Sequence, residues 1–430
     1  MISTLRIETL TRVEGHGSIV VEYDGDRAVD VRFDVSEGIR LFESVLRGRS
    51  YEDLAPFISR VCAICSAAHS LAALKAIEQA FEVHVSEQTE ALRELLMTGG
   101  NIASHALHVF LLAVPDYLGV SGGLALARSH PELLDIALRL KAVGNAIQDT
   151  VGGRAVHPVR AVPGGFSSIP VYEEMLALRR RIEQALSDAE AALDFVAGLP
   201  DPEPLPGSAA FLALRSPTGR GYYAGDQIVV QRRPDMRLVP ISDYRRFIAE
   251  DAPAHSHAKH ARLEGQAFMV GALARLETRA RPQDGLSERA MKDLGLHRPF
   301  GNPFDNNKAQ LVELAGDLER AGRCVQHILD ERIHAEEPVE VRPRAASGTA
   351  GTEAPRGLLV HSYAFDERGV VTAADVITPT AMNAASIEEQ LREAIARNPR
   401  APEEQLRARL EMLVRSYDPC LSCSVHVVRI

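Results

Sequence analysis

Apolar residues return every three or four positions over much of the chain, which is the spacing that places them on one face of a helix. This pattern predicts long helices at residues 66–81, 86–114, 131–152, 171–197, 258–278 and 306–332. It also predicts shorter helices at residues 38–47, 53–59, 387–396 and 402–416. A chain with this many amphipathic helices is expected to bury their apolar faces against one another in a bundle.

Alternation of apolar and polar residues predicts strands in three regions. The segments are residues 3–10, 17–23 and 28–33, short strands within 211–230, and a hairpin of 357–365 with 370–377. Residues 199–208 read as a connector and residues 334–353 as a loop, because both are poor in periodic apolar positions. We therefore expect one domain over residues 1–430, mainly α with small peripheral β-sheets, in which residues 1–36 form an N-terminal β region.

Charge and segment composition narrow the class of protein. The formal net charge of −10 argues against non-specific binding to nucleic acid. Residues 1–14 lack a basic segment followed by an apolar run, so no signal peptide is predicted. Apolar runs such as residues 106–115 are too short to cross a bilayer. A cytoplasmic protein without a membrane segment is expected.

Four of the five cysteines form two Cys-x-x-Cys pairs, Cys62 with Cys65 and Cys420 with Cys423. Two such pairs offer four soft sulfur ligands, which suit zinc, nickel, copper(I) or an iron–sulfur centre. A disulfide, a redox dithiol and a structural zinc ribbon are the alternatives. A zinc ribbon normally closes over a short loop, whereas more than 300 residues separate these pairs. A metal held here would tie the two ends of a large fold together.

The residues around both pairs carry a resemblance to a known family. The pairs stand in Arg-Val-Cys-x-x-Cys-x-x-x-His, residues 60–69, and in Asp-Pro-Cys-x-x-Cys-x-x-His, residues 418–426. Three further motifs occur in order: Arg-Val-Glu-Gly-His at 12–16, Glu-Ala-Pro-Arg-Gly at 353–357 and Thr-Pro-Thr at 378–380. Together they resemble the large subunit of nickel–iron hydrogenases, in particular the alpha subunit of NADP-linked cytoplasmic sulfhydrogenases. The resemblance implies that family's helical-bundle fold and a hydrogenase activity.

The resemblance implies a nickel–iron centre. Cys62 and Cys420 would be terminal nickel ligands, while Cys65 and Cys423 would bridge nickel to an iron that carries carbon monoxide and cyanide. It also implies a magnesium ion held by Glu43, the Val376 carbonyl and His426, and a carboxylate oxygen suits such a hard cation.

The resemblance also implies roles in heterolytic cleavage of H2. Cys420 would be the base and Glu14 the next proton acceptor. Arg356, with Asp418 nearby, would polarise the open position and donate a hydrogen bond to cyanide, since a guanidinium normally stays charged. Three residues would support the centre from outside the ligand set: His69, Pro355 and Thr380.

Other polar residues are interpreted as structural. His105 and His108 are expected at a helix contact, and Cys324 is expected to be a small buried apolar residue. The motif of His255, His257 and His260 is not predicted to bind metal, because no carboxylate or cysteine stands in register with it. At residue 104 this chain has serine, where many members of the family have aspartate.

Electrons are expected to leave to another polypeptide. The chain has no Gly-x-Gly-x-x-Gly motif after a strand, no P-loop and no spare cysteines for an iron–sulfur cluster. The resemblance implies an iron–sulfur small subunit, diaphorase-type subunits that bind flavin and NADP, and nickel-insertion factors. It further implies a maturation protease that removes the tail 427–430 after metal insertion.

Two alternatives stay open. In the first, the same centre serves NAD, coenzyme F420 or another carrier. In the second, the chain is a non-catalytic scaffold of an electron-transfer complex with structural zinc, like the related quinone-binding subunit of respiratory complex I, which typically lacks the four cysteines.

Overall fold

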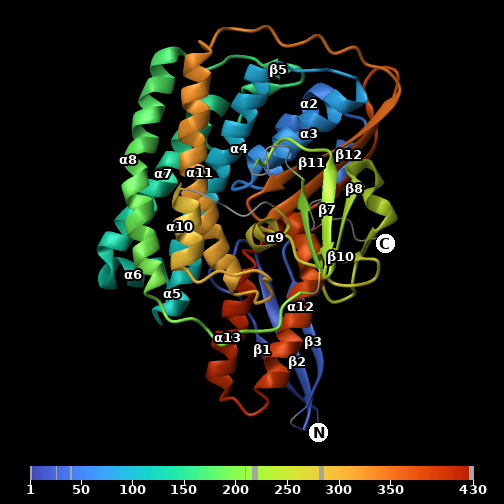
Figure 1. Cartoon of the computed structure of the whole chain (residues 1–430). Helices are drawn as coiled ribbons and strands as arrows, with labels where there is room; N and C mark the ends of the chain where they lie inside the picture. The colour runs from blue at the N-terminus through green and yellow to red at the C-terminus, as the bar shows by residue number, and fades with distance from the viewer. Residues whose placement is uncertain are drawn as a thin grey trace.

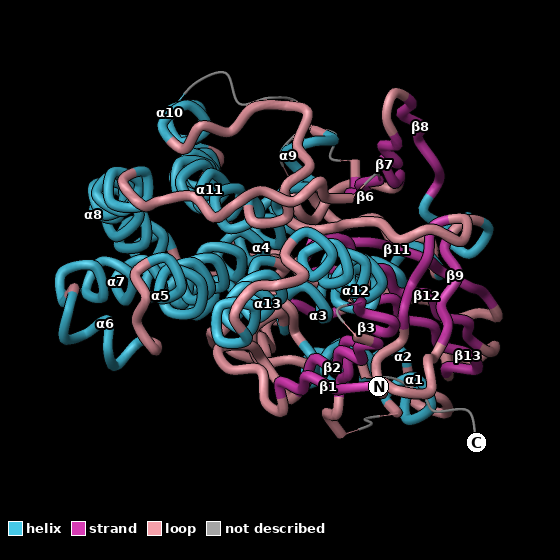
Figure 2. Tube along the Cα trace, turned by 90° about the horizontal axis from the view of Figure 1, so that it is seen from below, coloured by secondary structure: helices cyan, strands magenta, loops and turns pink. Residues whose placement is uncertain are grey.

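The computed structural model describes residues 2–25, 27–38, 41–208, 210–215, 221–279 and 285–425. His426 and the tail 427–430 lie outside these residues. Long helices form one side of the molecule and small sheets the other, as Figures 1 and 2 show. The predicted class, mainly α with small antiparallel sheets, is confirmed.

The helical side is a bundle of four long helices. These are α4 (Glu87–Leu107), α7 (Pro131–Gly152), α8 (Tyr172–Ala197) and α11 (Asp305–Asp330). Helix α4 packs against α7 and α11, and α8 packs against the same two helices from outside. At Gly144 the backbones of α7 and α4 come so close that an added Cβ would lie 2.5 Å from the Ala103 nitrogen. The bundle core is therefore closely packed around small residues.

The segment Glu87–Tyr117 is long and apolar enough to cross a membrane by composition, but 83% of its most apolar window is buried inside the protein. It consists of α4, the π-helical turn η2 (His108–Ala113) and α5 (Val114–Tyr117). Such burial is what the central helix of a folded core shows.

Shorter helices connect the bundle to the sheets. They are α1 (Phe42–Leu46), α2 (Tyr51–Ile58), η1 (Ser59–Val61), α3 (Ser66–Ala80), α6 (Gly123–Ser129), η3 (Ile241–Arg246), α9 (Ala272–Thr278), α10 (Gly285–Asp293), α12 (Pro379–Arg397), α13 (Glu403–Ser416) and α14 (Leu421–Ser424).

The described strands form three antiparallel three-stranded sheets and two strand pairs. The sheets are β1 (Ile2–Ile7), β2 (Gly17–Asp24) and β3 (Arg27–Val35); β6 (Ala210–Leu214), β7 (Gln227–Arg232) and β8 (Asp235–Pro240); and β11 (Ala346–Ala354), β12 (Gly357–Phe365) and β13 (Val371–Ile377). The pairs are β4 (Ala161–Val162) with β5 (Gly165–Phe166), and β9 (Ile248–Asp251) with β10 (His260–Leu263).

Two sequence predictions are wrong. Residues 258–278 do not form one helix: β10 comes first, and α9 begins only after Gly271, whose φ of 116° breaks any helix. Residues 346–354 are strand β11 and not loop. The strand lacks apolar alternation because α3 packs directly on it, and a Cβ at Gly348 would lie 2.0 Å from the Ala76 oxygen. Small residues are required there.

The fold brings the two chain ends together. Residue Glu14 forms a parallel bridge with Cys420, and Ala258 forms an antiparallel bridge with Val425. Helix α12 packs against β3, so the N-terminal sheet and the C-terminal segment share one support. This arrangement places the two cysteine pairs next to each other in the core.

Candidate metal centre

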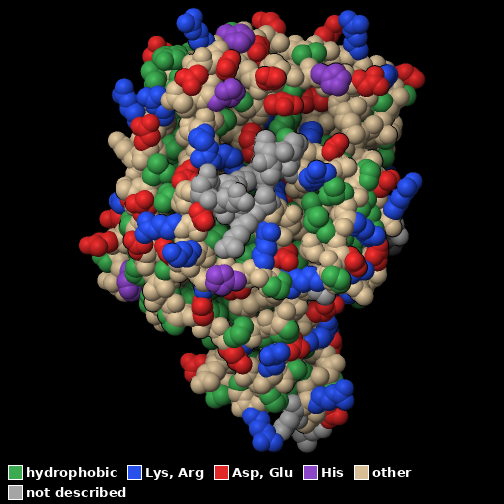
Figure 3. All heavy atoms as spheres, viewed as in Figure 1, with side chains coloured by type: hydrophobic (Ala, Val, Ile, Leu, Met, Phe, Trp, Pro, Cys, Tyr) green, Lys and Arg blue, Asp and Glu red, His purple; other side chains and the backbone are tan. Residues whose placement is uncertain are grey.

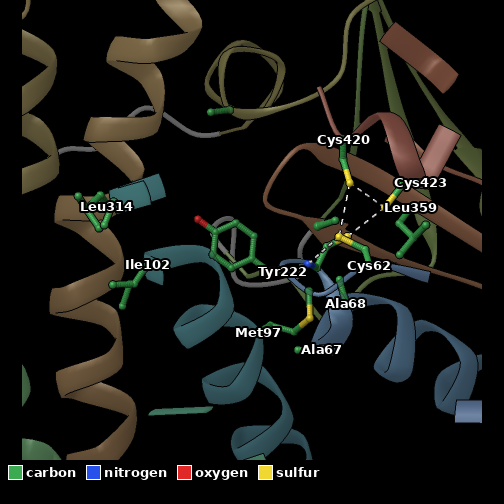
Figure 4. Close-up of a cluster of buried hydrophobic side chains, with 14 of the residues drawn as sticks. Cys62, Ala67, Ala68, Met97, Ile102, Tyr222, Leu314, Leu359, Cys420 and Cys423 are labelled. Carbon is green, nitrogen blue, oxygen red and sulfur yellow. Dashed lines mark hydrogen bonds between the residues drawn. The ribbon is translucent and has the colours of Figure 1, made fainter. Parts of the chain in front are cut away.

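Four buried cysteine sulfurs meet at the junction of the two chain ends. Their Sγ atoms all lie within 4.8 Å of one another. The Sγ atoms of Cys62 and Cys420 are 3.4 Å apart, and those of Cys65 and Cys423 are 3.5 Å apart. Figure 4 shows Cys62, Cys420 and Cys423 directed toward one another. The shortest separation, 2.9 Å between Cys420 and Cys423, is far above a disulfide bond length, and all four residues are free cysteines.

Local structure directs each sulfur inward. Cys62 follows η1, and Cys65 is the N-terminal cap of α3 and donates its backbone N–H to the Cys62 sulfur at 3.3 Å. Cys420 caps the short helix α14, and its own N–H is bound by the Thr380 hydroxyl at 2.9 Å. The Cys-x-x-Cys spacing therefore turns each pair of sulfurs to one side of the chain.

The protonation of these sulfurs tests whether the cluster fits a metal. Hydrogen bonds from the Cys420, Cys423 and Cys62 thiols lower the pKa of Cys65 well below its usual value. Burial raises the pKa of Cys420 and of Cys423 well above it. Burial therefore opposes the presence of several thiolates side by side unless a cation compensates their charge. Four thiolates in this volume require a soft metal cation, so the donor set fits such an ion.

The carboxylate of Glu14 contacts the cluster from the N-terminal segment. Its Oε2 atom lies 3.1 Å from the Cys420 sulfur and accepts the Ser422 backbone N–H at 3.1 Å. The Ser422 hydroxyl donates to the other carboxylate oxygen. Gly15 allows this approach, because a Cβ there would lie 2.8 Å from Leu421 Cβ. Glu14 is therefore held in hydrogen-bond contact with one sulfur.

Arg356 brings a buried positive charge to the same place. Its Nε donates to the Asp418 backbone oxygen at 2.7 Å, and its Nη2 lies 3.0 Å from Asp418 Oδ1. Burial by itself would lower the pKa of Arg356, but Asp418 and the cysteines outweigh it and raise the pKa well above its usual value. Its Nη1 is buried and has no hydrogen-bond partner in the described part of the chain. A charged donor is thus left over beside the sulfurs.

Asp418 is fixed from the bundle side. Its Oδ2 accepts the Gln310 amide at 3.0 Å, and Gln310 is bonded in turn to His108. His108 also contacts the Arg415 carbonyl oxygen at 2.8 Å. His108 therefore lies at a contact with α11, as predicted, and it supports a residue next to the cysteines.

His69 begins a chain of buried rings. It hydrogen-bonds to Cys65, which helps lower the pKa of that cysteine. Its Nδ1 lies 3.1 Å from His361 Nε2, and His361 Nδ1 lies 2.7 Å from the Tyr363 hydroxyl. Pro355 is buried and its carbonyl accepts a hydrogen bond from Arg275 at 2.9 Å. The structure thus places His69 and Thr380 in contact with the cysteines and buries Pro355 beside Arg356.

Two of the three predicted magnesium ligands come together. The Val376 N–H donates to Glu43 Oε1 at 2.9 Å. The Lys259 ammonium lies 3.3 Å from the same oxygen and 3.4 Å from Glu250 Oε2. Glu43 therefore lies in a partly buried polar site that already contains the positive charge of the Lys259 side chain.

Sequence reasoning missed four residues of this region: Gln310, His361, Lys259 and Ser422. Gln310, His361 and Lys259 lie in segments that were assigned to a predicted helix or strand, and Ser422 lies within a named motif. Their partners lie far away in the sequence, so no local spacing pointed to them. Only Ser422, inside the second Cys-x-x-Cys pair, carried a positional signal.

Comparison with known proteins gives consistent results. A family model described as nickel-dependent hydrogenase matches residues 40–137 and 235–426, and a HoxL-like model matches residues 4–37. The chain is 38% identical to sulfhydrogenase 1 subunit alpha of Pyrococcus furiosus, over 99% of this chain and 98% of that protein. Identity to sulfhydrogenase 2 subunit alpha of the same organism is 34%, over 99% and 100%.

Solved structures give the same picture. The fold matches that of an NAD⁺-reducing [NiFe]-hydrogenase in the H2-reduced state with a TM-score of 0.88 and 26% identity, covering 99% of each chain. A [NiFeSe]-hydrogenase from Dm. baculatum shares the fold with a TM-score of 0.79 at 23% identity, over 99% of this chain and 100% of that one.

Proposed function

Because this chain belongs to the nickel-dependent hydrogenase family, as its catalytic large subunit, we propose that it exchanges the electrons of H2 with NADP(H) through an iron–sulfur subunit in the cytoplasm. The observation that carries the proposal is the set of four buried sulfurs, joined by Glu14 and by the Arg356 Nη1, which has no hydrogen-bond partner among the described residues. The resemblance found in the sequence motifs is confirmed by relatives that match nearly the whole chain.

The four cysteines, Cys62, Cys65, Cys420 and Cys423, would together hold a nickel–iron group. When bound, this group supplies a Lewis-acidic, redox-active site at which H2 is cleaved heterolytically. Carbon monoxide and cyanide on the iron are part of the proposal. The Nη1–H of Arg356, for which the described part of the chain offers no acceptor, supports it, since such a buried charged donor suits an anionic ligand such as cyanide.

Proton movement follows from the residues themselves. The Cys420 sulfur would take the proton, and Glu14, 3.1 Å away, would receive it. The two donors from Ser422 hold the carboxylate in place for that transfer. Arg356 would stay charged, because Asp418 and the cysteines raise its pKa. Its role would be to polarise the site and not to act as base.

Other residues would set the shape of the site. Thr380 would hold the Cys420 backbone and hydrogen-bond a diatomic ligand, while Pro355 would pack against these ligands. His69 would support the Cys65 sulfur, and Asp418 would fix the orientation of Arg356.

A magnesium ion would be bound by Glu43, the Val376 carbonyl and His426. The proximity of Glu43 to Val376 supports this. Lys259 would then share the Glu43 carboxylate with the ion.

The partners would be an iron–sulfur small subunit and diaphorase-type subunits that bind flavin and NADP. The relatives support an assembly, since they are named as alpha subunits. Nickel-insertion factors and a protease that removes the tail 427–430 would complete maturation. Intact mass of the active protein tests this last step, and active material that still ends at Ile430 would contradict it.

The decisive experiment is an infrared spectrum of the anaerobically purified protein, made with its maturation factors, together with metal analysis of the same sample. Carbonyl and cyanide bands with nickel equimolar to the chain are expected. Zinc without such bands would instead identify the cysteines as a structural site.

A second carrier, NAD, is favoured by one observation, the TM-score of 0.88 with the NAD⁺-reducing enzyme. Rates of H2-dependent reduction of NADP⁺ and NAD⁺ by the purified assembly decide between them. A higher kcat/KM for NADP⁺ is expected.

A further inference from the structure

Two histidines and one glutamate meet at a place away from the cysteine centre. His255 follows β9, His260 begins β10, and Glu388 lies on α12. One ligand atom from each lies within 4.8 Å of the other two. The sequence offered no carboxylate in register with these histidines, yet the fold brings Glu388 to them from 128 positions beyond His260 (388 minus 260).

His260 has an unused buried nitrogen. The side chain is 2% exposed, and its Nε2 has no hydrogen-bond partner among the described residues. An unpaired buried polar atom destabilises a fold, so native structures seldom leave one without a reason. This nitrogen is well prepared to bind a ligand.

His255 and Glu388 are already paired. His255 Nε2 lies 2.8 Å from Glu388 Oε1, and the two imidazole rings stand edge to face with centroids 5.8 Å apart. Glu388 Oε1 also accepts the Phe33 N–H at 3.0 Å, which fixes the carboxylate. The Glu388 side chain is 6% exposed while that of His255 is 24% exposed, so an ion could enter from the His255 side.

We propose that His255, His260 and Glu388 form a second metal site, which binds a divalent first-row transition ion of the Zn²⁺ type with solvent as the remaining ligand. Two neutral imidazoles and one carboxylate are a donor set that suits Zn²⁺. The ion accepts the free lone pair of His260 and replaces the hydrogen bond between His255 and Glu388. A modest contraction of the three donor atoms completes the site.

Arg392 is a positive charge that lies close to Glu388 and opposes an ion here. Its Nη2 lies 3.4 Å from Glu388 Oε2, but its side chain is 47% exposed, and it also donates to the Val31 oxygen. Solvent screens so exposed a charge. Glu388 Oε1 remains available to the ion.

The site braces the segment that holds both chain ends. Between the two histidines, Ser256 Oγ accepts the Val35 N–H at 3.1 Å and Lys259 N–H donates to the Ser424 oxygen at 3.3 Å. Ser424 directly follows Cys423. An ion at this site therefore locks β3, α12 and the residues next to the cysteine centre to one another, which is a structural role.

The test uses the holoenzyme, dialysed against Zn²⁺ and then against metal-free buffer. About one retained Zn²⁺ per chain is expected, and its X-ray absorption should show nitrogen and oxygen ligands at about 2.0–2.1 Å. Sulfur ligands at about 2.3 Å would instead place the zinc on the cysteines and overturn the proposal.

Variants make the assignment specific. His260→Gln and Glu388→Gln should each lose the retained Zn²⁺ while nickel content stays unchanged. Glu388→Gln keeps an oxygen for the Phe33 N–H, so it tests the charge with little risk to folding. His257→Gln is the matched control, because that ring contacts the Glu37 carbonyl outside the cluster. Zinc retained by His260→Gln and by Glu388→Gln, or no zinc retained by the unmodified protein, would overturn the proposal.

Discussion

A comparison of two buried polar clusters in the described part of the core shows opposite ways to bury charge. In one, Arg275, 1% exposed, is paired with Glu313 at 2.6 Å and with Glu353 at 2.8 Å. His105 completes it through Glu313 at 3.0 Å. In the other, four cysteine sulfurs of like charge when ionised face one another. The first cluster is balanced by its own arginine, whereas the four sulfurs of the second face the single charge of Arg356, which is already paired with Asp418.

This difference separates a structural network from a ligand site. Burial alone would raise the pKa of Glu313, but Arg275 outweighs it and the pKa is lowered. At the cysteines burial wins for Cys420 and Cys423, whose pKa values are raised. A buried cluster whose charge the protein compensates only in part is therefore the one that requires an external cation.

The two clusters are also connected. Arg275 donates to the carbonyl oxygens of Ala354 and Pro355, and the next residue, Arg356, contacts Asp418 beside the cysteines. The Arg275 network thus fixes the backbone of Ala354 and Pro355. This backbone leads directly to Arg356, the charged donor beside the cysteines. On the face of the molecule that Figure 3 presents, acidic and basic side chains are interspersed and do not separate into clusters of one charge.

The largest effect is expected from removing one sulfur ligand. Cys65→Ser should abolish nickel binding and H2 oxidation, a loss greater than the about 10–100-fold in metal affinity that loss of an outer hydrogen-bond partner costs. Metal analysis and H2-dependent dye reduction measure this. A Cys65→Ser protein with full nickel content and infrared bands would show that this sulfur is not a ligand.

Glu14→Gln should leave the metals in place and slow proton exchange. General acid–base groups contribute about 10²–10⁴-fold, so hydrogen–deuterium exchange should fall by that order while nickel content is unchanged. Glu37→Gln is the control, because Glu37 bonds His16 nearby without contacting a sulfur. Full exchange activity in Glu14→Gln would exclude the proposed proton route.

Arg275→Met should destabilise the fold without removing a metal ligand. The buried carboxylates of Glu313 and Glu353 would lose their shared arginine partner. Breaking a buried ion pair in this way lowers the free energy of unfolding by about 3–5 kcal/mol. Thermal unfolding of the assembled protein measures the effect. Adding Glu313→Gln and Glu353→Gln to Arg275→Met should restore part of the stability. An Arg275→Met protein as stable as the parent would refute the idea that Arg275 balances the charges of the two glutamates.

The smallest effect is expected at Cys324, the cysteine outside the centre. Burial raises its pKa to about 12. At pH 8 its thiolate fraction is then only about 10⁻⁴, rising about tenfold per pH unit, so alkylation of the folded protein should be slow and should accelerate with pH. Cys324→Ser should leave nickel content and activity unchanged. Rapid modification of Cys324 at pH 8 would show that burial does not protonate this thiol.

The sequence by itself determined the four cysteines that the fold brings together and the class of fold. The Cys-x-x-Cys spacing spans four residues, and the helical period of apolar positions spans a few turns. Both patterns can therefore be recognised in the sequence without knowledge of tertiary contacts. The helix over Pro131–Gly152 and the strands β2 and β3 were predicted almost to the residue for this reason.

Only the tertiary structure decided which distant residues meet. Strand β11 was missed because its small residues serve contact with α3 and not apolar alternation. Lys259 beside Glu43, Gln310 beside Asp418, and Glu388 beside His255 and His260 are pairings across elements far apart in the chain. Local spacing carries no information on such pairings, because they depend on how helices and sheets pack together.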